Sequence, residues 1–99
     1  MALLKNISGE LTQEVLAVGD SDVVSLISLV NTHASASCTV DVYIEKKLTG
    51  KFYLAKAVTL PIGVTLVLDG VGFNNGSGGF SLFIKLTGSS ASTVDVIIN

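Results

Sequence analysis

Apolar and polar residues alternate with a period of two along several segments of the chain. The clearest are CTVDVYIEK (38–46), FSLFIKLT (80–87) and STVDVII (92–98). In the first of them Val40 and its alternate neighbours fall on one face, and Asp41 falls on the other. Such alternation is typical of a strand that has one face in the core and one in water. We therefore expect half-buried strands in antiparallel sheets.

Turn-forming residues separate these segments at intervals of about eight to twelve residues, a spacing typical of sandwiches and barrels. The pattern predicts one all-β domain over residues 1–99, an antiparallel β-sandwich of about eight strands in jelly-roll or immunoglobulin-like order. Residues 1–7 are expected to be an N-terminal arm or an edge strand. The strands are expected near residues 2–7, 13–18, 23–31, 38–46, 51–60, 64–68, 80–87 and 93–98.

One phrase occurs twice, as SASCTVDVYI at 35–44 and SSASTVDVII at 89–98. The similarity extends to residues 25–44 and 80–98 with one gap, and each copy is predicted to be a β-hairpin with its Asp in solvent. Two half-exposed strands can converge on Thr, Val and outward Asp. The alternative to this convergence is an ancient duplication, or two equivalent hairpins in facing sheets.

Charge is scarce, and its distribution limits the classes of partner. Six lysines and eight acidic residues give a net charge of -2, without the basic clusters that nucleic-acid binding requires. Charged residues make up 14% of the chain, against about 25% in average soluble domains. Ser and Thr account for part of this difference, and a surface covered by partners would account for the rest. Polar residues interrupt the uncharged stretch 23–40 too often for a membrane helix, so no membrane partner is expected.

Side chains that could support catalysis are few. A nucleophile needs a base beside it, and the chain has a single His33, in a Ser-rich turn, and a single Cys38, on the apolar face of a predicted strand. Zinc sites draw on several Cys and His ligands. The outward carboxylates Asp41, Glu45 and Asp95 could approach one another only if the two predicted hairpins are neighbours. We predict no enzyme activity, no catalytic or metal-binding residue and no cofactor.

Two loops carry oxygen side chains that calcium could use, GDSD at 19–22 and DGVGFNNG at 69–76. Neither has the twelve-residue spacing of the common calcium loop, and Asp in a tight turn more often caps the backbone. The glycines of residues 69–79 also lack the helix and the Lys-Ser or Lys-Thr pair of a phosphate-binding loop. This stretch is expected to be a flexible connection whose tip contacts a partner.

The candidate interface residues lie in three places: the apolar N-terminus, the outward aromatic residues and the tip of the 69–79 loop. They are Leu3, Leu4, Tyr43, Tyr53, Phe83, Phe73, Asn74 and Asn75. Tyr43 and Tyr53 could hold a sugar ring, form a cross-strand contact or anchor an interface.

Several short motifs follow one another in a characteristic order: Val30-Asn31, the turn 35–37, Thr39 to Val42, Tyr53 to Lys56, Pro61 to Gly63 and Thr93 to Val96. Over residues 13–98 this order resembles a group of small β-sandwich virion proteins of tailed bacteriophages, including phages of marine bacteria. The corner PIG departs slightly from the Pro-Ala-Gly-like corner expected there.

The resemblance implies a structural role without catalytic residues. It suggests a capsid decoration or cement protein on the capsid exterior that binds the major capsid protein and bridges its subunits. The alternative is a tail, neck or fibre module that recognises a host glycan or receptor. A closed homodimer or homotrimer is expected, and Met1 to Ile7 could add as a strand to a neighbour's sheet.

Overall fold

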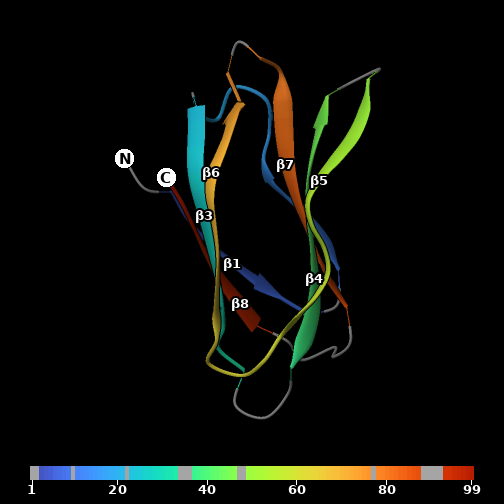
Figure 1. Ribbon diagram of the computed structural model, residues 1–99, viewed down its shortest axis with the longest axis vertical. Helices are drawn as coiled ribbons and strands as arrows, with labels where there is room; N and C mark the ends of the chain where they lie inside the picture. The colour runs from blue at the N-terminus through green and yellow to red at the C-terminus, as the bar shows by residue number, and fades with distance from the viewer. Residues whose placement is uncertain are drawn as a thin grey trace.

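The computed structural model is a sandwich of two four-stranded antiparallel sheets (Figure 1). It describes residues 3–9, 11–21, 23–33, 37–46, 49–76, 78–87 and 93–99. The strands are β1 (Leu3–Ser8), β2 (Thr12–Leu16), β3 (Val23–Asn31), β4 (Cys38–Lys46), β5 (Gly50–Leu60), β6 (Thr65–Asn74), β7 (Phe80–Thr87) and β8 (Thr93–Ile98). The predicted eight-stranded all-β sandwich is confirmed.

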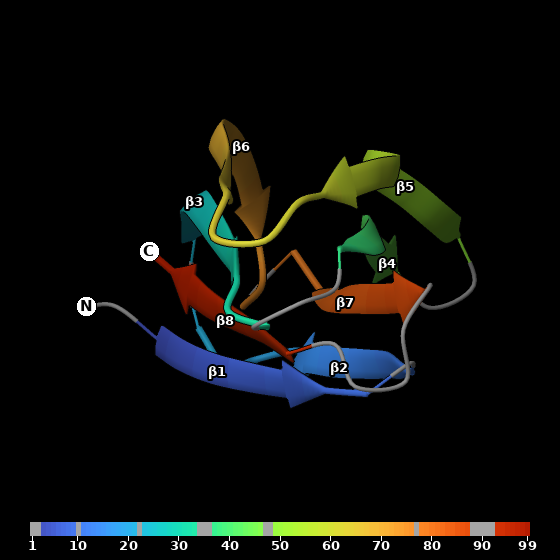
Figure 2. The same ribbon diagram turned by 90° about the horizontal axis from the view of Figure 1, so that it is seen from below.

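The order of the strands is that of a jelly roll. Sheet A has the order β1-β8-β3-β6 and sheet B the order β2-β7-β4-β5. The first strand thus pairs with the last, the second with the seventh, the third with the sixth and the fourth with the fifth, as in a long hairpin wrapped into a sandwich. Figure 2 shows β1 and β2 together at one side of the sandwich, with β5 and β6 at the other. The immunoglobulin-like alternative is excluded.

The two copies of the repeated phrase are not hairpins, and this prediction was wrong. Strands β3 and β4 lie in different sheets, as do β7 and β8, so each copy crosses from one sheet to the other. Together they supply the inner strands of both sheets. The register is equivalent in the two sheets, because Leu29 pairs with Val96 and the aligned residues Ile84 and Val42 also pair. The copies therefore occupy equivalent positions in the two facing sheets.

The inward faces of these inner strands form most of the core. Burial of aliphatic side chains there removes apolar surface from water, which is the main favourable term in folding. Along the edge strands β5 and β6, inward residues such as Leu54 and Leu68 are only half-buried, whereas Leu60 and Phe73, near the strand ends, are buried. The fully buried large side chains include Ile7, Leu16, Val24, Ile27, Leu29, Val40, Val42, Leu60, Leu82, Ile84, Leu86, Val94, Val96 and Ile98.

Strand β6 is longer than the sequence indicates. Residues 69–74, predicted as part of a flexible loop, continue the strand and pair with the beginning of β3, where Val24 lies opposite Phe73. Gly70 and Gly72 adopt positive φ angles of 72° and 57° inside the strand. Their conformational freedom serves an irregular strand beside a register shift in β3, which explains why the glycine pattern resembles that of a loop.

A buried asparagine joins two loops at one end of the sandwich. The Asn75 side-chain oxygen accepts a 2.7 Å hydrogen bond from the Ser21 N–H. Its amide nitrogen donates to the carbonyl oxygens of Ala17, at 3.1 Å, and Phe80, at 2.6 Å. Asn31 has a related role near the β5–β6 corner, where its amide nitrogen donates to the Leu60 carbonyl at 2.9 Å. Buried polar side chains need such partners, so both residues help to determine the loop conformation.

We predict that Asn75→Asp destabilises the protein by about 2–3 kcal/mol, because a side-chain oxygen would then face the carbonyls of Ala17 and Phe80. Asn74→Asp is the matched control. The Asn74 side chain only accepts, from the Gly78 N–H at 3.0 Å, and Asp retains that acceptor. Denaturant unfolding measures both variants at neutral pH. Equal losses of stability in the two variants would contradict this role of Asn75.

Candidate functional site

The outer faces of the two sheets each carry a row of side chains across four strands. Residues paired on antiparallel strands share a face, so the register defines each row. On sheet B the row is Glu14, Phe83, Tyr43 and Tyr53. On sheet A it is Leu4, Ile97, Ser28 and Val67.

The aromatic rings of the sheet B row contact one another. Tyr43 lies 5.2 Å from Tyr53 and 5.2 Å from Phe83 between ring centroids, and it is stacked on Phe83 with an interplanar angle of 9°. The ammonium of Lys51 lies 4.9 Å from the centroid of Tyr43, and that of Lys56 lies 4.3 Å from the centroid of Tyr53. Tyr43 is only 7% exposed. Of the roles considered for the tyrosines, the cross-strand contact is present, and the Tyr43 ring has no open face on which a sugar could stack.

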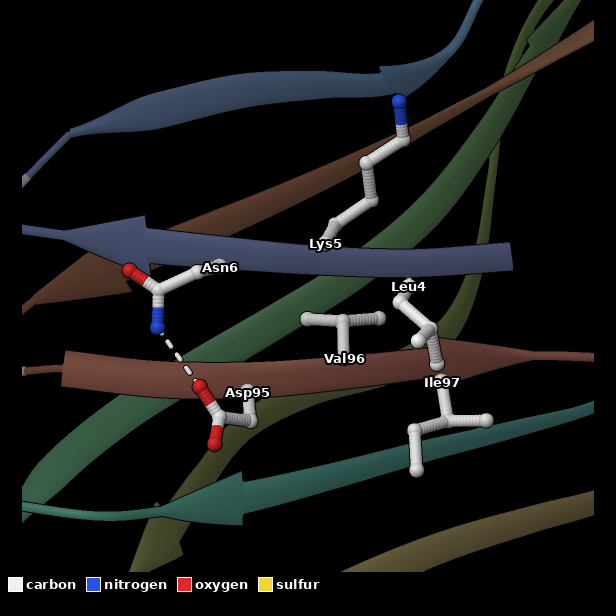
Figure 3. A pocket seen from close by; sticks show the side chains of 6 residues that line it. All are labelled: Leu4, Lys5, Asn6, Asp95, Val96 and Ile97. Carbon is white, nitrogen blue, oxygen red and sulfur yellow. Dashed lines mark hydrogen bonds between the residues drawn. The ribbon is translucent and has the colours of Figure 1, made fainter. Parts of the chain in front are cut away.

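Apart from the half-buried Ser28, the side chains of the sheet A row are aliphatic and exposed. Leu4 is 72% exposed, Val67 52% and Ile97 41%. Leu26 and Val30, in the rows on either side, are half-buried. A shallow pocket of about 360 Å³ opens over β1 and β8, where Leu4 and Ile97 lie together (Figure 3). We call the outward side chains Leu4, Leu26, Val30, Val67 and Ile97 the aliphatic face.

The Asp of each repeated phrase joins an inner strand to an edge strand. Asp95, at the rim of the pocket, accepts a 2.6 Å hydrogen bond from the Asn6 side-chain amide on β1 (Figure 3). Asp41 accepts a 2.6 Å bond from the backbone N–H of Ala57 on β5, a residue with a positive φ of 53°. The prediction that both are simply solvated is corrected. They also lie on opposite faces of the sandwich, so the outward carboxylates do not converge on one cleft.

The predicted N-terminal interface residues belong to an edge strand. Residues 3–8 pair with β8 within the same chain, as the edge-strand alternative predicted, and Met1 and Ala2 lie outside the described residues. Leu3 is half-buried against the core, whereas Leu4 points outward.

The predicted loop tip is built into the fold. Phe73 is buried in the core and Asn75 is fully buried between two loops, so neither is presented to a partner, contrary to expectation. Asn74 is half-buried beside them. The structural reason is that this segment completes β6 and its turn.

The side chains that could support catalysis or bind a metal lie in the core or in hydrogen-bonded turns. Cys38 is buried in the core opposite Leu60, and the His33 N–H donates to the Asn31 side-chain oxygen at 3.0 Å. Asp20 accepts from the Ala17 N–H at 3.0 Å, as a turn-capping Asp does. In the part of the chain that the structure describes, no three His, Cys, Asp or Glu residues converge as a metal site would require.

No protein-family model and no curated protein sequence matches this chain. Among the described residues, none forms a helix long and apolar enough to cross a membrane.

Sequence reasoning did not identify the aliphatic face, although a signal was present. In TVDVII the alternation that places Asp95 outward places Ile97 outward too. Leu4 is a predicted interface residue, but only as part of an N-terminal arm or edge strand, and Val67 lies in a short apolar run without a clear period. Their proximity depends on pairing between strands far apart in the sequence.

We predict that Asp95→Ala increases amide hydrogen exchange in β1, whereas Asp41→Ala increases it in β5. Each variant removes one side-chain hydrogen bond to an edge strand. We expect this loss to lower the local opening free energy by roughly 0.5–1 kcal/mol, which raises the exchange rate about two- to fivefold. Exchange measured by mass spectrometry or NMR tests this, with each variant serving as the other's control. Identical exchange profiles in the two variants would refute the paired roles.

Proposed function

We propose that this chain is a non-enzymatic virion structural protein, a capsid decoration protein that binds the outside of a bacteriophage head and bridges subunits of the major capsid protein. The aliphatic face is the observation that carries the proposal. Three large aliphatic side chains more than 40% exposed lie on the outside of one sheet, beside a shallow pocket. Exposed large apolar side chains that gather on one face are typical of interaction sites in soluble proteins. The resemblance in motif order to phage virion proteins supports the choice of partner.

The composition suits binding that depends on an assembled lattice. A protein that binds only the closed shell stabilises the shell by mass action. Modest contacts at several subunits give avidity without a single tight site. Such cohesion requires apolar and backbone contacts, which agrees with a chain that is 14% charged and 48% hydrophobic. A closed dimer or trimer remains part of the proposal, because soluble homo-oligomers usually have closed symmetry.

The alternative, a tail, neck or fibre module for a host glycan or receptor, receives less support. A glycan-binding site would require an aromatic ring with an exposed face, surrounded by polar groups. The Tyr43 ring is enclosed by Phe83, Tyr53 and Lys51, as described above.

The proposal predicts saturable uptake of the purified protein by heads assembled without it, and no binding to host glycans. Decorated heads should rupture at a higher temperature than bare heads, since binding stabilises the bound state by mass action. Sedimentation measures uptake, and the release of packaged DNA during heating measures rupture. Glycan binding without binding to heads would overturn the proposal, and an unchanged rupture temperature would remove its stabilising role.

A further inference from the structure

Addition of a partner strand is opposed at both edges of sheet A. Lys5 occupies an inward position of β1, between Leu3 and Ile7, and is exposed. An inward-pointing charge on an edge strand disfavours pairing with another sheet. At the other edge, β6 contains two glycines with positive φ and lies beside a register shift. These features make further pairing at either edge irregular.

The edges of sheet B carry similar features. Strand β2 has only five residues and a register shift between Glu14 and Leu16. Strand β5 has two register shifts relative to β4, a positive φ at Ala57 and exposed Lys51 and Lys56. Short, bulged and lysine-bearing strands are the usual protection against edge pairing. A partner is therefore expected to contact a sheet face.

The two sheet faces differ in how far their own side chains cover them. On sheet B, lysine ammonium groups lie over two of the three rings, and the central ring is almost buried. On sheet A, the row of Leu4, Ile97 and Val67 has no such cover, and Lys5 extends away from Leu4 and Ile97 (Figure 3). Tyr53 of sheet B is also 44% exposed, but a lysine ammonium lies over its ring. The exposed side chains of the sheet A row are aliphatic, so a partner that covers them removes apolar surface from water.

Among the described residues, the charged side chains that point outward on the aliphatic face have one sign. Asp69 and Asp95 point outward from β6 and β8, whereas Lys5, which also lines the pocket, extends from the other side of β1 (Figure 3). Sheet B is mixed, with outward Lys51 and Lys85 interspersed with Glu14, Asp41 and Glu45. Complementary charge favours a positive surface opposite the two aspartates. Face-to-face pairing of two copies would instead place their four carboxylates in one interface, which is unfavourable.

We propose that the aliphatic face is the docking surface of this protein, and that its partner is a protein surface with aliphatic side chains and lysine or arginine at the rim. The inference rests on the proposed function, in which that surface belongs to the capsid shell. The aliphatic row supplies the apolar contact, and Asp69 and Asp95 orient the partner through its basic groups. Sheet B then faces away from the shell.

The apolar part is tested with Leu4→Lys and Val67→Lys, each on bare heads. Each change places a charge in the apolar contact, so we expect binding to weaken at least about tenfold. Ile62→Lys is the matched control, because Ile62 is an aliphatic residue 47% exposed in the connection between β5 and β6, outside the outward rows of sheet A. A cooperative thermal unfolding transition establishes that each variant is folded. Two independent positions are used so that the test remains valid if one variant does not fold.

The charge part is tested with Asp69→Lys, with Glu14→Lys on sheet B as its control. We expect Asp69→Lys to weaken binding about tenfold or more at low ionic strength, and the difference from wild type to shrink as salt is added. Glu14→Lys should bind as wild type does. Equal binding by Asp69→Lys and wild type at every salt concentration would overturn the basic character of the partner.

The outcomes separate the docking surface from the proposed function. Loss of binding in both sheet A variants, with binding retained by Ile62→Lys, supports the docking surface. Wild-type binding by Leu4→Lys and Val67→Lys overturns it and leaves the decoration role standing. Failure of the wild-type protein to bind heads overturns the decoration role, and docking to the shell with it. Self-association in light scattering that Leu4→Lys abolishes would make a second copy the occupant and overturn the partner assigned here.

Discussion

Packing of the inner strands of one sheet against those of the other is the interaction on which the rest of the structure depends. These strands come from the two copies of the repeated phrase, and their inward aliphatic side chains are almost completely buried. A slip of one residue in either sheet would turn those side chains to solvent. The register is therefore strongly determined at the centre of both sheets, and every outward row follows from it.

The edge strands are held in place by individual side-chain hydrogen bonds. Asp41 and Asp95 occupy equivalent positions in the two copies, and each forms a hydrogen bond to the edge strand beside it. Asn31 and Asn75 connect strand ends to loops through buried hydrogen bonds. The polar residues of the repeat thus position the periphery, while its apolar residues form the centre. Repetition of the phrase serves architecture rather than chemistry.

The same architecture separates the two outer faces by character. Equivalent central rows are aromatic on sheet B and aliphatic on sheet A. Aromatic rings and lysine side chains cover one another on sheet B, through ring stacking and cation–π contacts that contribute to stability. Aliphatic side chains have no such partners on sheet A and remain exposed. This difference, more than any single reactive group, directs the functional interpretation toward binding a large partner.

The sequence by itself determined most of the strands and, where the alternation is clear, their inward residues, because period-two alternation is a local property of an extended chain. Residues 38–46 and 80–87 have the bounds that their alternation predicts. Only the tertiary structure decided which sheet each strand joins, so that two predicted hairpins became crossovers and residues 69–74 became strand. It also decided the aliphatic face, since Leu4, Val67 and Ile97 are distant in sequence and meet only through pairing across β1, β8, β3 and β6. Strand pairing is a non-local choice governed by burial of the whole core, and alternation within one segment carries no record of it.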